Sequence, residues 1–197
     1  MNRLEEIIEE IKKLEKELVA EIQKKQEEFF YKVKGKDVLF EETVKAYHEK
    51  FAIKIPTYLY SSSLLNILVL PVIWSCIIPA VFLDAVVSVY QCICFKVYGI
   101  PEVKRSEYIV MDHESLSYLN AIEKINCMYC GYFNGLIAYV QEIAARTEQY
   151  WCPIKHARKL KTIHSRYGKF FEYGDCDEYR RRLEEVRRDF HDLQDDQ

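Results

Sequence analysis

The chain has 197 residues, of which 49% are apolar and 30% are charged, a composition typical of an ordered protein of one or two domains. Only 6 Gly and 5 Pro stand against 15 Tyr and 10 Phe, which disfavours a sandwich or barrel with a turn every ten residues. The 28 basic and 31 acidic residues nearly balance, which excludes the strongly basic surface of a dedicated nucleic-acid binder. We therefore expect an all-helical protein that binds no nucleic acid.

The first thirty residues predict one amphipathic helix. Its apolar side chains recur at spacings of three and four, as in a heptad seam: Leu4, Ile7, Ile11, Leu14 and Leu18. The seam lasts for only about three heptads. Two interpretations stay open: residues 4–22 pair with a second copy or a partner helix, or the helix packs on its own domain. A basic turn near Gly35 and an amphipathic stretch over 38–51 complete a helical N-terminal region, residues 1–56.

Residues 57–98 predict a membrane segment. The apolar part, 58–95, has 38 residues, about 57 Å as a helix, which is too long for one untilted crossing and slightly short for two. Basic residues flank it on both sides: Lys36, Lys45, Lys50 and Lys54 before it, and Lys96, Lys104 and Arg105 after it. This balance favours a bent, re-entrant or hairpin segment over a single crossing or a buried soluble core.

The same balance predicts that both polar regions lie on one side of the membrane. The N-terminus has no basic leader followed by an apolar core, so nothing in the sequence proposes export and we expect that side to be cytoplasmic. Asp84 is the charged residue inside the apolar region. A carboxylate at membrane depth costs about 2.5–3.5 kcal/mol unless it has a partner, so Asp84 is either a functional residue or lies at the level of the headgroups.

Seven cysteines, an odd number, are expected to be reduced thiols or metal ligands before disulfides. Four candidate ligands follow the spacing C-x2-C-x21-C-x3-H: Cys127, Cys130, Cys152 and His156. Cys127 and Cys130 are one helical turn apart, and Pro153 is predicted to restart a helix with Cys152 at its cap. A Cys3His set is the usual chemistry of structural zinc, whereas iron or an iron–sulfur cluster, a redox dithiol and buried free thiols are the alternatives.

Residues 99–197 predict a helical domain that carries these cysteines. Asp112 is expected to cap a helix that continues to about Tyr150, and residues 179–197 form a charged, solvated helix. The spacing of Gly131 and Gly135 lets another backbone approach the long helix. Charged residues that lie near the cysteines, or on a polar face of the long helix, are candidates for functional or metal-supporting roles: His113, Glu123, Glu142, Arg146 and Glu148.

Several motifs resemble a family of small bacterial membrane-associated proteins. They are Tyr98-Gly99-Ile100-Pro101, Asn126-Cys127-x-Tyr129-Cys130, Asn134-Gly135 and the long stretch EIAARTEQYWCPIKHA, residues 142–157. The resemblance covers roughly residues 70 to 190, and the N-terminal helical region lies outside it. It implies membrane association, but the family has no established activity, so the resemblance implies no mechanism.

Two functions follow from these patterns. One is a membrane-anchored protein that binds a metal, zinc first, through the Cys/His set. The other is a scaffolding or interaction subunit of a membrane complex in which the cysteines only pack. Whether the protein is an enzyme is left open, because the chain shows no nucleophile–base pair, phosphate loop or cofactor fingerprint.

Overall fold

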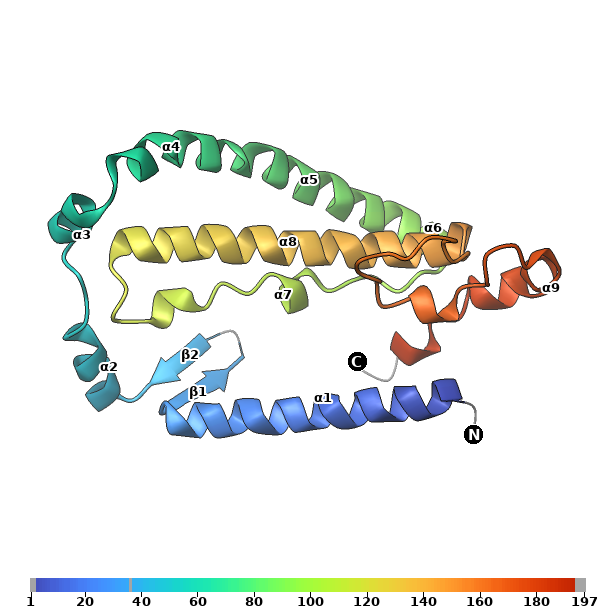
Figure 1. Cartoon of the computed structure of the whole chain (residues 1–197), viewed down its shortest axis with the longest axis horizontal. Helices are drawn as coiled ribbons and strands as arrows, with labels where there is room; N and C mark the ends of the chain where they lie inside the picture. The colour runs from blue at the N-terminus through green and yellow to red at the C-terminus, as the bar shows by residue number, and fades with distance from the viewer. Residues whose placement is uncertain (1–2, 36, 194–197) are drawn as a thin grey trace. The chain divides into compact units, whose positions relative to one another are not determined.

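The computed structural model describes residues 3–35 and 37–193 and is mostly helical, as predicted (Figure 1). The elements are α1 (Arg3–Glu28), β1 (Tyr31–Lys34), β2 (Asp37–Phe40), α2 (Glu42–Glu49), α3 (Ile55–Ser61), α4 (Leu64–Ser75), α5 (Ile77–Tyr90), α6 (Lys96–Tyr98), α7 (Arg105–Tyr108), α8 (Ala121–Trp151) and α9 (Cys176–Val186). They form two compact units, each built from separated segments. The first unit contains the described residues up to Ser62 and Asp112–Met128, and the second contains Ser63–Met111 and the described residues from Tyr129.

The first unit contains a β-hairpin that the prediction of a wholly helical N-terminal region missed. β1 and β2 pair antiparallel, with Tyr31 opposite Phe40 and Lys34 opposite Asp37. The turn uses Gly35 at φ +65°, a conformation that glycine adopts without strain. Apolar and charged side chains alternate along β1, and exposed and half-buried positions alternate along β2, which suits a strand better than a helix.

α1 is the amphipathic helix that the heptad spacing predicts. Its apolar side chains Ile11, Leu14 and Leu18 are exposed. A partner helix for residues 4–22 therefore stays a prediction.

The apolar segment in the second unit is one bent helical path. α4 and α5 are separated only by Cys76, and a π-helical turn over Gln91–Phe95 leads into α6. The chain does not reverse direction between Leu64 and Tyr98, so the predicted hairpin does not form. Pro79 lies in the first turn of α5, where a backbone N–H has no partner within the helix, so it does not force a reversal.

α8 begins later than predicted, at Ala121 instead of near Asp112. Asn120 caps it: its side-chain oxygen accepts the backbone N–H groups of Ile122 (3.0 Å) and Glu123 (3.1 Å). The Glu123 carboxylate accepts the backbone N–H of Asn120 at 2.9 Å, which completes a capping box. Asp112 is instead followed by a short 3₁₀ turn, His113–Ser115.

This cap gives a first testable prediction. Replacing Asn120 with alanine removes an acceptor for two N–H groups, so we expect the free energy of unfolding to fall by about 0.5–2 kcal/mol. Urea denaturation followed by circular dichroism measures this change. Asn134→Ala is the matched control, because the Asn134 amide only donates to the carbonyl of Cys130 within the same helix. An equal loss in both variants would contradict the capping role.

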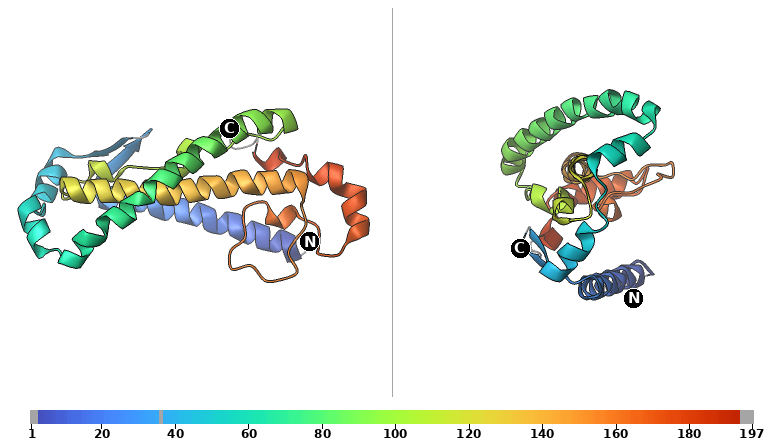
Figure 2. Two further views of the ribbon diagram at one scale, coloured as in Figure 1. Left: turned by 90° about the horizontal axis from the view of Figure 1, so that it is seen from above. Right: turned by 90° about the vertical axis from the view of Figure 1, so that its left-hand side faces the viewer.

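The core of the second unit lies where α5, the segment 100–109 and α8 meet. Its buried apolar residues are Ala80, Phe95, Ile100, Val103, Ile109, Leu136, Tyr139, Ile143 and Phe190. Seen from above, α4–α6 crosses obliquely over this part of α8 (Figure 2). The Gly131/Gly135 face of α8 does receive another backbone, as predicted, and that backbone is the segment Tyr108–Val110.

The chain after α8 differs from the prediction of a second helix. Pro153 restarts no helix; its carbonyl accepts the N–H of Phe171 at 2.8 Å, and Lys155 donates to the carbonyl of Phe171 at 2.8 Å. This bridge holds the strand-like residues 153–155, so no helix places Cys152 and His156 one turn apart. α9 begins at Cys176, capped by Asp175, and ends at Val186, earlier than the predicted C-terminal helix.

Candidate functional site

The largest unusual surface on the second unit is the apolar helix itself. Within the described residues, Leu64–Tyr98 is the one helix long and apolar enough to cross a membrane. Only 6% of its most apolar window is buried. A core helix of a soluble protein would instead be mostly covered. This surface is therefore available to a solvent or partner that accepts apolar side chains.

Exposure differs between the two halves of this helix. α4 has no buried residue, and its side chains Leu64, Leu68 and Val72 are 70%, 64% and 68% exposed. α5 is two-sided: Ala80 is buried against the core, whereas Phe82 is 71% exposed. The N-terminal half is thus mostly apolar and has no buried side chain, and the next half presents one apolar face outward and packs the other.

Asp84 lies on the packed side of α5 and is fully engaged. Its carboxylate accepts from Nε of Arg105 (3.1 and 3.2 Å) and from Nη2 (2.7 Å). The hydroxyl of Tyr132 on α8 donates to it at 3.0 Å and that of Ser88 at 3.4 Å. Asp84 therefore joins three segments of the chain. A paired carboxylate avoids most of the cost that an isolated one meets in an apolar environment.

Polar bonds also connect α5 with α8 and the segment after α6. The buried side chain of Gln91 accepts the backbone N–H of Val103 (2.8 Å) and donates to the carbonyl of Val103 (3.1 Å). It also donates to the hydroxyl of Tyr139 at 2.9 Å. At the other end, the hydroxyl of Tyr129 donates to the carbonyl of Ile73 at 2.9 Å. Hydrogen bonds thus attach one face of the apolar helix to the rest of the second unit.

Glu142 and Arg146, both singled out in the sequence, form a buried ion pair on α8. Nε of Arg146 donates to Glu142 at 2.8 Å, and Nη1 donates to the carbonyls of Pro101 (2.8 Å) and Glu102 (3.2 Å). The hydroxyl of Ser165 donates to the other carboxylate oxygen of Glu142 at 2.6 Å. The pair therefore holds two distant loops on α8.

A cavity of about 240 Å³ adjoins this ion pair. It is lined by Pro101, Glu102, Lys104, Glu107, Tyr108, Glu142, Arg146, Ser165 and Leu193. Burial raises the pKa of the Tyr108 hydroxyl, with Glu142 adding to the effect, so this hydroxyl stays protonated at neutral pH. The charges in the wall are largely matched: Lys104 lies 3.5 Å from Glu107, and Arg146 pairs with Glu142.

Three consecutive loop residues dock on one face of α8. His164 Nε2 lies 3.1 Å from Glu148, Ser165 bonds to Glu142, and Nε of Arg166 donates to Gln149 at 2.6 Å. Within the stretch of residues 142–157 that carries the family resemblance, Glu142, Arg146, Glu148 and Gln149 thus bind other parts of the same chain. No sequence pattern predicts a role for Gln149, Ser165 or Arg166, because an isolated glutamine, serine or arginine shows no characteristic spacing.

Arg166 also anchors the end of the described chain. Although burial by itself would raise the pKa of the Asp192 carboxyl, hydrogen bonds from Arg166 and Lys169 hold that pKa well below its usual value. A carboxyl group with a depressed pKa in the folded state adds stability that is complete above the unfolded-state pKa of about 4 and is lost as the pH falls below it.

We therefore expect the thermal unfolding midpoint to fall between pH 5 and pH 2 by more in the wild type than in an Asp192→Asn variant. The expected difference is modest, because the Asp192 side chain is half-exposed and solvent screens the pair. Differential scanning fluorimetry across this pH range measures it. If the unfolding midpoints of the two proteins fall by the same amount between pH 5 and pH 2, Asp192 contributes nothing to the stability at neutral pH.

The four proposed metal ligands are not brought together. Cys127, Cys130 and Trp151, the residue before Cys152, lie on one continuous helix. At 1.5 Å per residue, Cys127 and Cys152 are therefore about 37 Å apart. His156 lies in the loop beyond, where its backbone N–H donates to the hydroxyl of Tyr167. No group of three or more His, Cys, Asp or Glu side chains in the part of the chain that the structure describes has metal-binding geometry.

The remaining candidates have local partners. His113 Nδ1 lies 3.3 Å from the Asp112 carboxylate, and Glu123 belongs to the capping box of α8. All seven cysteines are free thiols, and five of them, including Cys130 and Cys152, are exposed. Binding of zinc or iron by this protein stays a prediction, which metal analysis of the purified chain would test.

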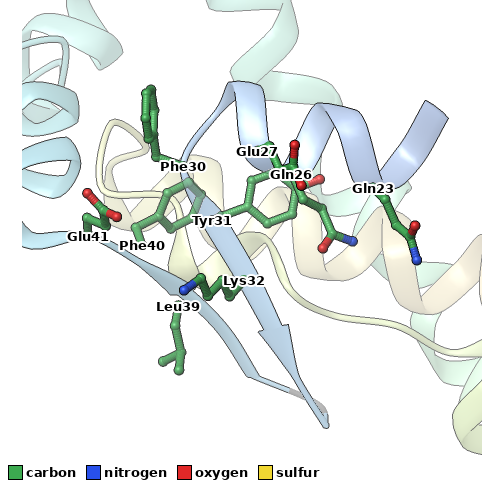
Figure 3. A pocket seen from close by; sticks show the side chains of 9 residues that line it. All are labelled: Gln23, Gln26, Glu27, Phe30, Tyr31, Lys32, Leu39, Phe40 and Glu41. Atoms are coloured by element: carbon green, nitrogen blue, oxygen red, sulfur yellow. The ribbon is translucent and has the colours of Figure 1, made fainter. Parts of the chain in front are cut away.

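The first unit has a larger cavity, about 580 Å³, between the end of α1 and the hairpin (Figure 3). It is lined by Gln23, Gln26, Glu27, Phe30, Tyr31, Lys32, Leu39, Phe40 and Glu41. The rings of Tyr31 and Phe40 pack with their centroids 5.6 Å apart. The wall mixes amide, aromatic and aliphatic groups without a cluster of like charges or candidate metal ligands.

Comparison with protein-family models, with curated proteins and with solved structures finds no match to this chain. The resemblance drawn from the sequence motifs therefore stays an expectation.

Proposed function

We propose that the protein is a membrane-attached scaffold. α4 and the outward face of α5 insert into one leaflet of a bilayer and keep the polar parts of the chain at its surface. The observation that carries this proposal is the exposure of the Leu64–Tyr98 helix, whose apolar window is almost uncovered. An apolar surface of this extent in water would drive aggregation, whereas lipid satisfies it without any further partner.

Attachment at one surface fits the second unit better than a full crossing. The part of the helix before its first core residue, Ala80, is residues 64–79, 16 residues, which at 1.5 Å per residue gives about 24 Å, less than the roughly 30 Å of a hydrocarbon core. From Ala80 onward, one face of α5 packs on the segment 100–109, which is largely irregular and carries Lys104 and Arg105. Irregular backbone facing lipid is not tolerated in a bilayer core, so this face of α5 belongs outside it.

Surface attachment leaves both polar regions on the same side, which we propose is the cytoplasmic side. The polar groups near α8 support a scaffold over a catalyst, because Glu142, Arg146 and Asp84 are engaged by other parts of the chain. The exposed apolar stripe of α1 is the place where a second copy or a partner helix would bind. The family resemblance, which implies membrane association, agrees with this proposal.

Fractionation of cells that express the full chain tests the proposal. We expect the protein to stay in the membrane pellet after a carbonate wash. In intact cells, an impermeant maleimide is expected to miss the exposed thiol of Cys176, and an antibody is expected to miss an N-terminal tag; both should react after the membrane is opened. Recovery of the protein in the soluble fraction would contradict membrane attachment, and labelling of one end alone from outside would show a crossing.

A further inference from the structure

We infer that Asp84 is the positioning residue that keeps the Leu64–Tyr98 helix at the membrane surface instead of across the bilayer. This inference rests on the proposed membrane attachment and adds what fixes the depth of the helix. A set of contacts supports it: the Asp84 carboxylate, in the middle of an apolar helix, is bound by Arg105 from the segment after the helix and by Tyr132 from α8.

The sequence alone permits a deeper insertion. Asp84 is the sole charged residue from Ile55 to Phe95, a run of 41 residues. Residues 55–83 carry no charge, and without the charge of Asp84 this run would continue through α5 to Phe95 and allow a span that includes α5. Attachment of α5 at the surface therefore needs a feature that opposes such a span, and Asp84 is the one ionised side chain between Leu64 and Phe95.

The contacts show how Asp84 holds α5 in place. Its side chain is only 14% exposed, and both carboxylate oxygens accept bonds from Arg105. Arg105 comes from a segment that is itself fixed to α8, because Gly135 lets the carbonyl of Tyr108 and the Cα of Ile109 approach closely. The carboxylate thus attaches α5 to a backbone that cannot enter lipid.

Two arrangements of the helix follow. At the surface, Asp84 keeps Arg105 and Tyr132. Across the bilayer, α5 has to leave the segment 100–109, and Asp84 loses its partners at membrane depth. Asp84 opposes the second arrangement in two ways, through its charge and through its bonds to Arg105. Asp84→Asn removes the charge and weakens the bonds, whereas Arg105→Gln weakens the bonds and leaves the charge in the helix.

Protease protection distinguishes the two arrangements. The full chain, with a different epitope tag at each end, is synthesised in the presence of microsomes, floated with them, and digested from outside. We expect both tags of the wild type to be lost. Asp84→Asn and Arg105→Gln should each raise the fraction of chains with one protected tag, by about tenfold or more for Asp84→Asn. Glu107→Gln, which neutralises an exposed carboxylate two residues from Arg105, is the matched control and should behave as the wild type.

Each outcome has a definite meaning. Flotation of all four proteins with both tags lost in each would overturn the role of Asp84 while leaving membrane attachment intact. A protected tag in Asp84→Asn but not in Arg105→Gln would show that charge alone sets the depth, and would overturn the role of the bond. A wild type that fails to float would contradict the proposed function instead, and a protected tag in the wild type would show that the helix already spans.

Discussion

The Leu68→Glu/Val72→Glu double variant is expected to leave the membrane fraction and appear in the soluble fraction. Both side chains lie on one face of α4 and are largely exposed, so the substitutions remove little packing within the protein. A charged residue at the centre of a membrane helix costs about 2.5–3.5 kcal/mol, so two cost roughly 5–7 kcal/mol. At about 1.4 kcal/mol per tenfold, the partition coefficient should fall by about three to five orders of magnitude.

The matched control is Ile163→Glu/Tyr173→Glu, which places two carboxylates on exposed apolar side chains of the loop beyond α8. This variant should remain in the membrane pellet as the wild type does. Quantitative immunoblotting of the pellet and the supernatant after ultracentrifugation gives the ratio of membrane-bound to soluble protein. If both double variants leave the membrane equally, attachment does not depend on α4.

The second large effect is expected at Gly135. A Cβ at this position would lie 2.5 Å from the carbonyl oxygen of Tyr108 and 2.8 Å from the Cα of Ile109, and both neighbours are backbone atoms that cannot rotate away. Gly135→Ala therefore forces the segment 108–109 off α8, and overpacking of this kind costs about 1–3 kcal/mol or more. We expect a lower melting temperature in detergent and a shorter half-life under limited proteolysis.

Gly131→Ala is the control for Gly135→Ala. Its Cβ would meet a single close atom, the carbonyl oxygen of Val110 at 3.1 Å, and alanine favours a helix over glycine by about 1 kcal/mol. The cost of the close contact with Val110 and the gain in helix propensity nearly cancel. The stability of Gly131→Ala should therefore stay within about 1 kcal/mol of the wild type. Equal destabilisation of both variants would show that the close approach at Gly135 has no special role.

The sequence predicted the main features that follow from periodicity and composition. The heptad spacing gave α1, the charge-free run gave the apolar helix, and the long apolar stripe gave α8. The predicted regions 1–56, 57–98 and 99–197 are continuous stretches of the chain, drawn at changes in composition. Each compact unit instead combines separated segments. Asp112–Met128 belongs with the N-terminal unit, and no local pattern in the sequence encodes that contact.

The errors have definite physical causes. Asp112 and Asn120 are both good capping residues, but Glu123 lies at the third position after Asn120, and this completes the capping box that selects the later start. Pro153 is compatible with either a helix start or an extended segment, and the bridge with Phe171 selects the second.

The polar contacts of α5 and α8 could be predicted only in part. Asp84 stood out because a charge in an apolar region is costly unless paired. Glu142, Arg146 and Glu148 stood out because they lie near the cysteines. Their partners Arg105, Ser165 and His164 are distant in sequence, so the pairing appears only once the chain is folded.

The central claim is that α4 lies in lipid, and fluorescence quenching of Trp74 tests it most directly. The chain has two tryptophans, and Trp74 lies in α4. A Trp151→Phe variant therefore reports from α4 alone. After reconstitution into vesicles, lipids brominated on the acyl chain are expected to quench Trp74 strongly, and aqueous iodide is expected to quench it weakly. Strong quenching by iodide with none by the brominated lipids would contradict the claim.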